Sequence, residues 1–267
     1  MKEGVRLRPV QFHAKALVPR MISWGGAMVG LVAVAAFLFI ALVHLADNYH
    51  VDHIAGAWMA LTAYAHQGVL YPPHYGDGFY GGTRYGPTGI MLNTAAAATT
   101  GEYLTSGKVL ALLVMAAVLV LVYRIARDVE CGRAAAAAVV GAVIANYAAE
   151  FAGTSIYGDA LAVALQLAGI AVIARRDDRV GAALAGTLVA VAVTAKVSGL
   201  WGGAAILIWL ILRNRRSIVA FVAASGATSI ALFGLGALLS HGRMMENLVK
   251  LTGSGLNGFP TRLAHCT

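Results

Sequence analysis

Carboxylate side chains are scarce in this sequence, and four of them occupy positions suited to acid–base chemistry. The chain has 267 residues, of which 12 are Asp or Glu. Asp47 and Asp52 follow the first long apolar run, while Glu150 and Asp159 flank the joint between two later runs. A carboxylate near a low-dielectric boundary can have its pKa raised into the range useful for a general base. Asp52 is the first candidate base and Asp47 the second.

Cationic side chains lie at similar boundaries and could bind an anion such as phosphate. Arg84 lies in the long polar segment after the first apolar run, and Lys196 lies between two later runs. Arginine can grip phosphate with two parallel hydrogen bonds, whereas lysine acts as a point charge. Arg84 and Lys196 are therefore candidate anion-binding residues, with Arg243 as a weaker third.

The stretch YGGTRYGPTG, Tyr80–Gly89, differs from the Ala, Val and Leu runs around it. Its glycines allow the backbone to approach a ligand closely, and Pro87 is a preferred first residue of a helix. Tyr71, Tyr80 and Tyr85 could contact a ligand or cap a lipid headgroup. The alternative for each tyrosine is an ordinary place in the aromatic belt at the membrane interface.

Histidines in the same region raise a metal site as a weaker alternative. The histidines lack the helical i, i+4 pairing of zinc enzymes of the HExxH type. No GxSxG or GxxxxGK[ST] motif is present. We therefore expect no metal and no other cofactor. The residues concerned are His50, His53, His66 and His74 with Asp47, Asp52 and Asp77.

The composition indicates whether the chain folds in water or in a membrane. The chain is 59% hydrophobic and 12% charged, and its mean hydropathy is +0.74. Soluble domains hold about 25% charged residues. Only helices or closed barrels satisfy the backbone within lipid, and long apolar runs favour helices. We expect an all-α polytopic membrane protein. The net charge of +8 is spread along the chain, which argues against a nucleic-acid partner.

Apolar runs separated by short polar joints predict about seven transmembrane helices. The first run, Met21–Ala46, is too long for the h-region of a signal peptide. The later runs are Val109–Tyr123, Ala134–Ala149, Ala160–Ala174, Val180–Ala195, Val197–Leu212 and Ser217–Leu239. Several of these are short for a bilayer core, which requires about 20 residues.

Arginines fall at every second joint, and this alternation predicts the orientation. Loops on the cytoplasmic side of a membrane are enriched in Lys and Arg. We therefore expect a basic cytoplasmic tail over residues 1–20, a membrane module over 21–240 and a tail on the outer side over 241–267. The protein would lie in the inner (plasma) membrane. The arginines are Arg124, Arg127, Arg133, Arg175, Arg176, Arg179, Arg213, Arg215 and Arg216.

Residues 47–108 then form a long outer loop, and loops of about 60 residues usually have a function. Its first part has apolar residues at helical spacing, Ile54, Trp58, Leu61 and Ala65. A helix with this face would lie in the membrane interface. We expect a second juxtamembrane helix over Thr88–Leu104, because a full span there would reverse every later joint.

The order of these features resembles the GT-C superfamily of integral-membrane glycosyltransferases. That family has a first span, an acidic residue in the first outer loop, a short helix ending in a G..Y stretch, and a YPP or YGP step into an apolar helix. Here the pattern reads Asp52, AWMALTAYAHQGVLY (Ala57–Tyr71) and RYGP (Arg84–Pro87). The stretch Gly181–Trp201, with Lys196 near its outer end, is also similar. The resemblance covers residues 20–240.

The resemblance implies an inverting glycosyltransferase that moves a hexose or pentose from a polyprenyl-phosphate donor to an envelope glycan, lipid or protein. Asp52 or Asp47 would be the base, because many relatives have an Asp-Glu pair where this chain has two separated acids. The phosphate and sugar would meet Arg84, Lys196 and the tyrosines, with Arg243, Asp159 and Glu150 nearby. The alternatives are a multi-span transporter or scaffold, and an inactive, truncated member of the family.

Overall fold

A computed structural model of the chain describes residues 14–47, 53–73, 75–76, 79–80, 83, 85–156 and 158–250. These residues are helical except for loops and one short antiparallel ribbon. In the ribbon, Tyr75–Gly76 (β1) pairs with Phe79–Tyr80 (β2). The all-helical architecture expected from the composition is therefore confirmed.

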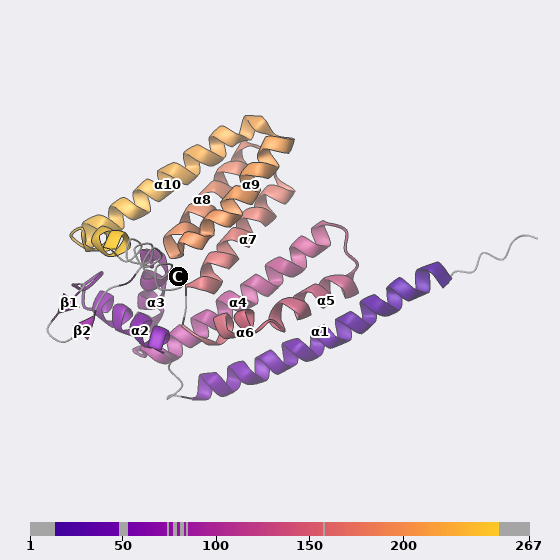
Figure 1. Cartoon of the computed structure of the whole chain (residues 1–267), viewed down its shortest axis with the longest axis horizontal. Helices are drawn as coiled ribbons and strands as arrows, with labels where there is room; N and C mark the ends of the chain where they lie inside the picture. The colour runs from indigo at the N-terminus through magenta and orange to yellow at the C-terminus, as the bar shows by residue number, and fades with distance from the viewer. Residues whose placement is uncertain are drawn as a thin grey trace, which may run out of the picture.

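One group of helices is built around the long helix α1, Ala14–Ala46, which runs beside α5, Arg133–Ile144, with α4, Tyr103–Asp128, next to them (Figure 1). Small residues allow this close approach. A Cβ on Gly30 would lie 2.9 Å from the Ala137 carbonyl oxygen, and one on Gly141 would collide with the Gly30 backbone. Such small-residue contacts are typical of helix pairs in membranes.

A second group contains α7, Asp159–Arg175, α8, Arg179–Ala195, α9, Leu200–Arg213, and α10, Ile218–Leu239. Helix α8 packs on both α7 and α10, and α7 also packs on α4, which joins the two groups. Val189, Ile206 and Leu210 are buried in the core between these helices. Gly186 lies so close to the Phe221 carbonyl that a side chain would clash there.

A third group gathers at one end of the molecule, where Figure 1 shows α2, α3 and the ribbon together. Helix α2 is His53–His66 and α3 is Pro87–Thr100. A short helical segment, residues 243–250, follows α10. Its Met244 is buried in one cluster with Trp58 of α2 and Ile90 of α3. This end therefore has an apolar core of its own.

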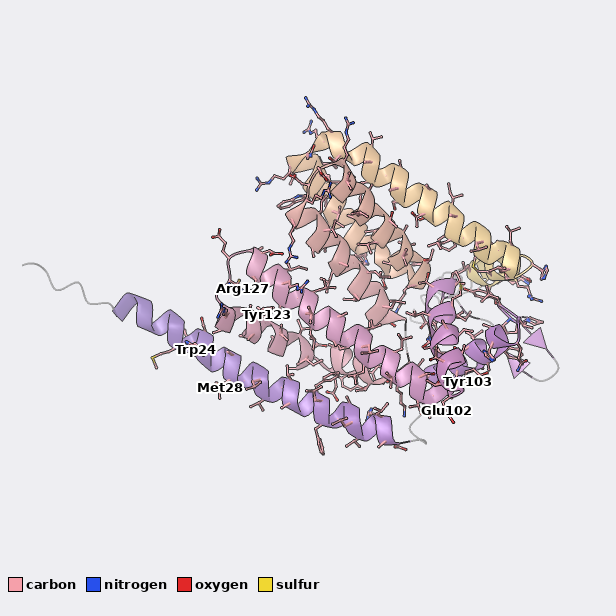
Figure 2. The ribbon with its side chains drawn as sticks, turned by 180° about the vertical axis from the view of Figure 1, so that it is seen from behind. Trp24, Met28, Glu102, Tyr103, Tyr123 and Arg127 are labelled. Atoms are coloured by element: carbon pink, nitrogen blue, oxygen red, sulfur yellow. The ribbon has the colours of Figure 1, made fainter. Side chains whose placement is uncertain are left out.

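Three helices are long and apolar enough to cross a membrane: Met21–Ala46, Tyr103–Asp128 and Arg215–Leu239. A fourth span results if α5 and α6, Tyr147–Thr154, are taken together across a bend of 75°. Trp24 and Met28 of α1 are exposed apolar side chains, as Figure 2 shows, which suits a helix in lipid. These features fit a multi-pass membrane protein, with three or four spans shown by length and composition among the described residues.

The run Ala134–Ala149, expected as one straight span, is interrupted in the structure. Helix α5 ends at Ile144, and α6 begins at Tyr147. Asn146 causes the new start, because its side-chain oxygen accepts a hydrogen bond of 2.9 Å from the Ala148 N–H. An asparagine in this position is a strong helix N-cap. Helix α3 begins at Pro87 as predicted. It ends at Thr100, where Gly101 adopts a left-handed conformation, and α4 already begins at Tyr103. The expected helix Thr88–Leu104 and the expected loop 47–108 therefore extend too far, and the span expected from Val109 begins earlier.

The expectation that the apolar face of α2 rests on the membrane is wrong. Trp58 is 1% exposed and Leu61 6% exposed, and both are buried against protein. The partners of this face include Leu70, Tyr71 and Ile90. The spacing correctly predicted an apolar face, but Leu70, Tyr71 and helix α3 cover it, so this face packs inside the protein while Ala57 and Ala60 on the other face are exposed.

Contacts bring the arginine-bearing joints to one end of the helices. Arg175 forms a two-pronged ion pair with Asp128, which joins the end of α7 to the end of α4. The Asp177 carbonyl accepts hydrogen bonds from Asn214 and Ser217, which joins the α7–α8 turn to the α9–α10 turn. Figure 2 shows Arg127 and Tyr123 at one end of α4 and Tyr103 at the other.

Candidate functional site

An ion pair between Lys196 and Asp159 lies at the opposite end of the helices from the arginine joints. Asp159 is the first residue of α7, and Lys196 directly follows the last residue of α8. Each charge therefore stands at the helix end that its sign stabilises. The side chains are 33% exposed for Lys196 and 38% exposed for Asp159, so the pair is partly shielded yet accessible.

An aromatic side chain covers the cation of this pair. The Tyr85 ring centroid lies 5.9 Å from Lys196 Nζ, within cation–π range. The same ring lies 5.0 Å from the ring of Trp58, tilted by 40°. Tyr85 is half-buried, so its ring links the apolar core beneath α2 to the charged pair.

The segment that carries Tyr85 is fixed to the end of α8 by its backbone. Gly86 packs on the Thr194 carbonyl so closely that any side chain would collide with it. One residue into α3, Thr88 and Thr194 share a hydrogen bond of 2.7 Å between their hydroxyls. Glycine at position 86 is therefore required for close approach between two protein backbones, whereas the sequence suggested approach to a ligand.

Tyr71 holds the backbone of Tyr85 in place through a hydrogen bond. Its side chain is 1% exposed, and its hydroxyl donates a hydrogen bond of 2.7 Å to the Tyr85 carbonyl. Burial raises the pKa of the Tyr71 phenol above its ordinary range, because the anionic form would be desolvated. Tyr71 also adopts a left-handed backbone with φ of 57°, which is rare for a bulky residue. It is thus a structural support rather than a surface that stacks on sugar.

Asp47 and Lys108 meet at the same end of the helices, but through the backbone. The Lys108 ammonium donates hydrogen bonds of 2.6 Å to the Asp47 carbonyl and 2.7 Å to the His44 carbonyl. Lys108 is 6% exposed. It bonds two carbonyls at the end of α1, so it ties α1 to the first turns of α4.

Arg243 and Glu150, the remaining charged candidates, lie outside the Lys196–Asp159 ion pair. Arg243 opens residues 243–250, beside Met244 of the apolar cluster, and its buried Nε has no hydrogen-bond partner within the described chain. Glu150 lies in α6, where its carbonyl accepts a hydrogen bond from Thr154. No hydrogen bond or ion pair of the described residues joins Glu150 to Lys196 or Asp159.

Several predicted residues lie outside what the structure describes. Asp52 and Arg84 fall outside the described residues, and Tyr80 is described only as backbone of β2. The weaker metal alternative also rests partly on such positions, His50, His74 and Asp77 among them. Their roles stay predictions. Arg84 nevertheless directly precedes Tyr85 in the chain, whose position over Lys196 is described.

Sequence reasoning missed the residues that hold the site together. Trp58 was assigned to the membrane interface, yet it lies under Tyr85 and against Gly158, where an added Cβ would be 3.2 Å from the indole ring. Thr88 and Thr194 are 106 positions apart, and no sequence pattern links them. Lys108 gave a signal, a single cation at the start of an apolar run, but its carbonyl partners depend on the tertiary fold.

The arrangement combines a cation that an incoming anion can reach, a carboxylate beside it and an aromatic ring above it. Such a set can bind a phosphate while a nearby carboxylate accepts a hydrogen bond from a second ligand. It contains no nucleophile activated by a base among the residues described.

Comparisons of the chain with protein-family models, characterised proteins and solved structures find no match.

Proposed function

We propose that this chain is a membrane glycosyltransferase that moves a sugar from a polyprenyl-phosphate donor to an acceptor of the cell envelope on the outer face. The observation that carries the proposal is the partly exposed Lys196–Asp159 pair beneath Tyr85. In the transfer, the acceptor oxygen attacks the anomeric carbon and the sugar–phosphate bond breaks, with inversion. The polyprenyl phosphate leaves with the bonding electrons, and a carboxylate takes the acceptor proton.

The departing phosphate requires cations, and three are proposed. Lys196 would exchange part of its bond to Asp159 for the phosphate. Arg84 would approach from the segment before Tyr85, and the guanidinium of Arg243 is proposed as a further donor from the segment that follows α10. Electrostatic stabilisation of charge that develops in the transition state is usually the largest single catalytic effect.

The base is proposed to be Asp52 or Asp47, both from the segment after α1. The Asp47 backbone is held next to α4 by Lys108, so this segment starts at the same end of the helices as the ion pair. The placement of several charged groups at one end supports a reaction at the membrane boundary.

The finer topology is part of the same proposal: seven spans in the inner membrane, with the N-terminus in the cytoplasm. The ion pair and hydrogen bonds that join the arginine-bearing joints support a common side for them. A transporter would be expected to have its charges near the middle of its helices, whereas Asp159 and Lys196 stand at helix ends.

The test is a transfer assay in membranes that contain the full chain, with a panel of radiolabelled polyprenyl-phosphate hexoses and pentoses. We expect label to move from at least one donor into an envelope fraction, and Lys196→Met to reduce that transfer. A panel with no transfer above membranes that lack the protein would refute the proposal.

A further inference from the structure

A largely apolar cavity has Asp159 of the ion pair in its lining. It has a volume of about 860 Å³ and lies between α4, α5, α6 and α7. This volume falls within the range of about 300–1,000 Å³ that is usual for small-molecule sites. The bend between α5 and α6 creates the space, because α6 turns away where a straight helix would continue.

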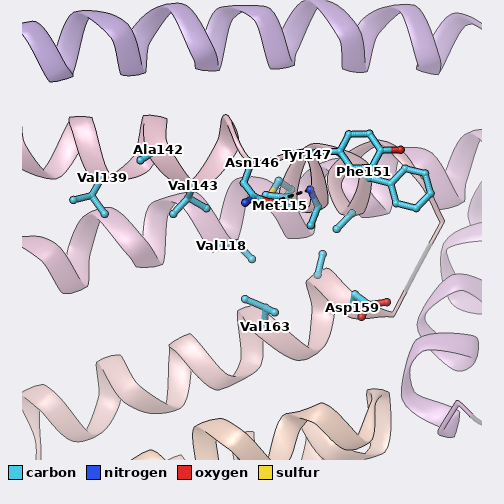
Figure 3. Close-up of a pocket in the computed structure, with 14 residues that line it drawn as sticks. Met115, Val118, Val139, Ala142, Val143, Asn146, Tyr147, Phe151, Asp159 and Val163 are labelled. Carbon is cyan, nitrogen blue, oxygen red and sulfur yellow. Dashed lines mark hydrogen bonds between the residues drawn. The ribbon is translucent and has the colours of Figure 1, made fainter. Parts of the chain in front are cut away.

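The lining is mostly apolar, with a carboxylate at one end. Figure 3 shows Asp159 at this end, with Tyr147 and Phe151 across from it, while Val139 and Ala142 lie toward the other end. The other polar groups of the lining are the Tyr147 hydroxyl and the Asn146 amide, whose oxygen already accepts a hydrogen bond from the Ala148 N–H. The cavity therefore has the form of an amphiphile site, with space for a chain and one hydrogen-bonding end.

The surroundings identify the chain as that of a lipid. Helix α4 is long and apolar enough to cross a membrane, and α5 with α6 passes as a bent span. Val139 and Val163 line the cavity and are 42% and 43% exposed, so the cavity communicates with the surroundings of these helices. Around a membrane span those surroundings are acyl chains.

The charge at the polar end identifies the headgroup. Asp159 contributes a carboxylate, which accepts hydrogen bonds and repels a phosphate. The cation that offsets this charge, Lys196, is not part of the cavity lining. A neutral head that donates a hydrogen bond fits this end, and a hydroxyl is the simplest such group.

We propose that the cavity between α4, α5, α6 and α7 binds the chain of a lipid acceptor whose hydroxyl donates a hydrogen bond to Asp159. The inference rests on the proposed transferase function and narrows its acceptor to a lipid. Lys196 then faces the phosphate of the donor while Asp159 holds the acceptor, so the ion pair stands between the two substrates.

The experiment is photocrosslinking of the purified full chain in phosphatidylcholine nanodiscs. One probe is a monoacylglycerol with a diazirine in its chain, and the other is the same chain with a phosphate head. We expect the hydroxyl probe to label peptides that carry Val143 or Val163 at least about tenfold more than the phosphate probe, the factor expected for one charge-assisted hydrogen bond. Equal labelling, or stronger labelling by the phosphate probe, would overturn the acceptor assignment.

Variants separate the cavity from general contact with lipid. Val163→Trp and Val139→Trp should each abolish the labelling by filling the cavity, the first from α7 and the second from α5. Val222→Trp is the matched control, because Val222 is 53% exposed on α10 and does not line the cavity. Asp159→Leu should remove the preference for the hydroxyl probe. Labelling that both cavity-filling variants leave intact would refute the site.

The two proposals fail in different ways. If the hydroxyl probe labels the cavity as expected but no polyprenyl-phosphate sugar is used, the lipid site stands and the transferase proposal fails. If sugar transfer proceeds at the same rate in Val163→Trp and Val139→Trp as in the unchanged protein, the transferase stands and the lipid-acceptor site is refuted.

Discussion

The Lys196–Asp159 pair can be tested by a double-mutant cycle that separates its structural role from its proposed role in phosphate binding. The variants are Lys196→Met, Asp159→Asn and the two combined. Methionine keeps most of the apolar length of lysine, and asparagine keeps the shape of aspartate. Each change therefore removes a charge with little loss of volume.

The expected magnitudes follow from where the two charges lie. Exposed ion pairs contribute about 0–1 kcal/mol, and breaking a buried pair costs about 3–5 kcal/mol. With side chains 33% and 38% exposed, we expect a coupling energy of about 1–2 kcal/mol. Each charge also stabilises its own helix end by about 0.3–1 kcal/mol. Each single variant should thus lose about 1.5–3 kcal/mol, and the double variant about 1.5–4.

Two quantities are measured for each variant: the free energy of unfolding in mixed detergent micelles and the affinity for a polyprenyl phosphate. Lys196→Met should weaken that binding about ten- to a hundredfold, the value of one charge-assisted hydrogen bond. Asp159→Asn should leave it equal or tighter, because Lys196 is released from its partner. The control is Lys250→Met, which breaks an exposed pair with Glu246.

A coupling energy below about 0.3 kcal/mol would show that the two side chains act independently, which contradicts the structure. If the coupling appears but Lys196→Met binds polyprenyl phosphate normally, the pair is structural only. The proposed phosphate site would then lose its central residue, and the proposal that Lys196 binds the donor phosphate would be refuted.

Three further outcomes are expected. Asp52→Asn should lower turnover by about 10²–10⁴, the usual contribution of a general base, and Asp47→Asn should lower it less; the reverse order in steady-state assays would make Asp47 the base. A reporter fused after Arg127 should report the cytoplasm and one fused after Ser240 the outer side, so an outer signal at Arg127 would refute the seven-span topology. The raised pKa of Tyr71 means that its neutral form contributes stability fully below pH 10.0, and this is lost as pH rises further. Tyr71→Phe should therefore show a smaller fall in stability above that pH, and an unchanged profile would count against the buried phenol.

The sequence predicted helix boundaries well where they depend on local chemistry. The runs Val180–Ala195 and Ala160–Ala174 correspond to α8, Arg179–Ala195, and α7, Asp159–Arg175. Polar residues flank these runs, and apolar residues fill them, so each boundary is encoded within a few positions. The start of α3 at Pro87 was predictable for the same reason, because proline is favoured at the first helical position.

The bend after Ile144 was missed although its signal is local. Asn146 interrupts an apolar run, and asparagine favours N-caps over helix interiors because its side chain competes for backbone hydrogen bonds. The prediction of a straight span gave more weight to overall hydropathy than to this one residue. The cavity at the bend could not be inferred either, since it depends on where α7 packs.

The candidate site was predicted in part as individual residues and hardly at all as an arrangement. The sequence placed Lys196 and Asp159 at the outer ends of two helices, but their pairing requires α7 and α8 to be neighbours with those ends aligned. Tyr85 was a candidate because of its type, whereas its position over Lys196 depends on contacts of Gly86 and Thr88 with Thr194. These contacts join residues more than a hundred positions apart, for which a single sequence has no periodic signal.

Trp58 was expected at the membrane interface, and its burial inside the protein accounts for the position of Tyr85. An apolar helical face after a membrane span can pack on lipid or on protein, and periodicity is the same in both cases. Here Leu70, Tyr71 and Tyr85 pack on that face, and the Tyr71 hydroxyl donates a hydrogen bond to the Tyr85 carbonyl. Because the face of α2 is used inside the protein, Tyr85 is held above Lys196 by a rigid core. The pair thus contacts the Tyr85 ring through Lys196 and the cavity beside α7 through Asp159, an arrangement that suits the proposed transfer between two membrane-bound substrates.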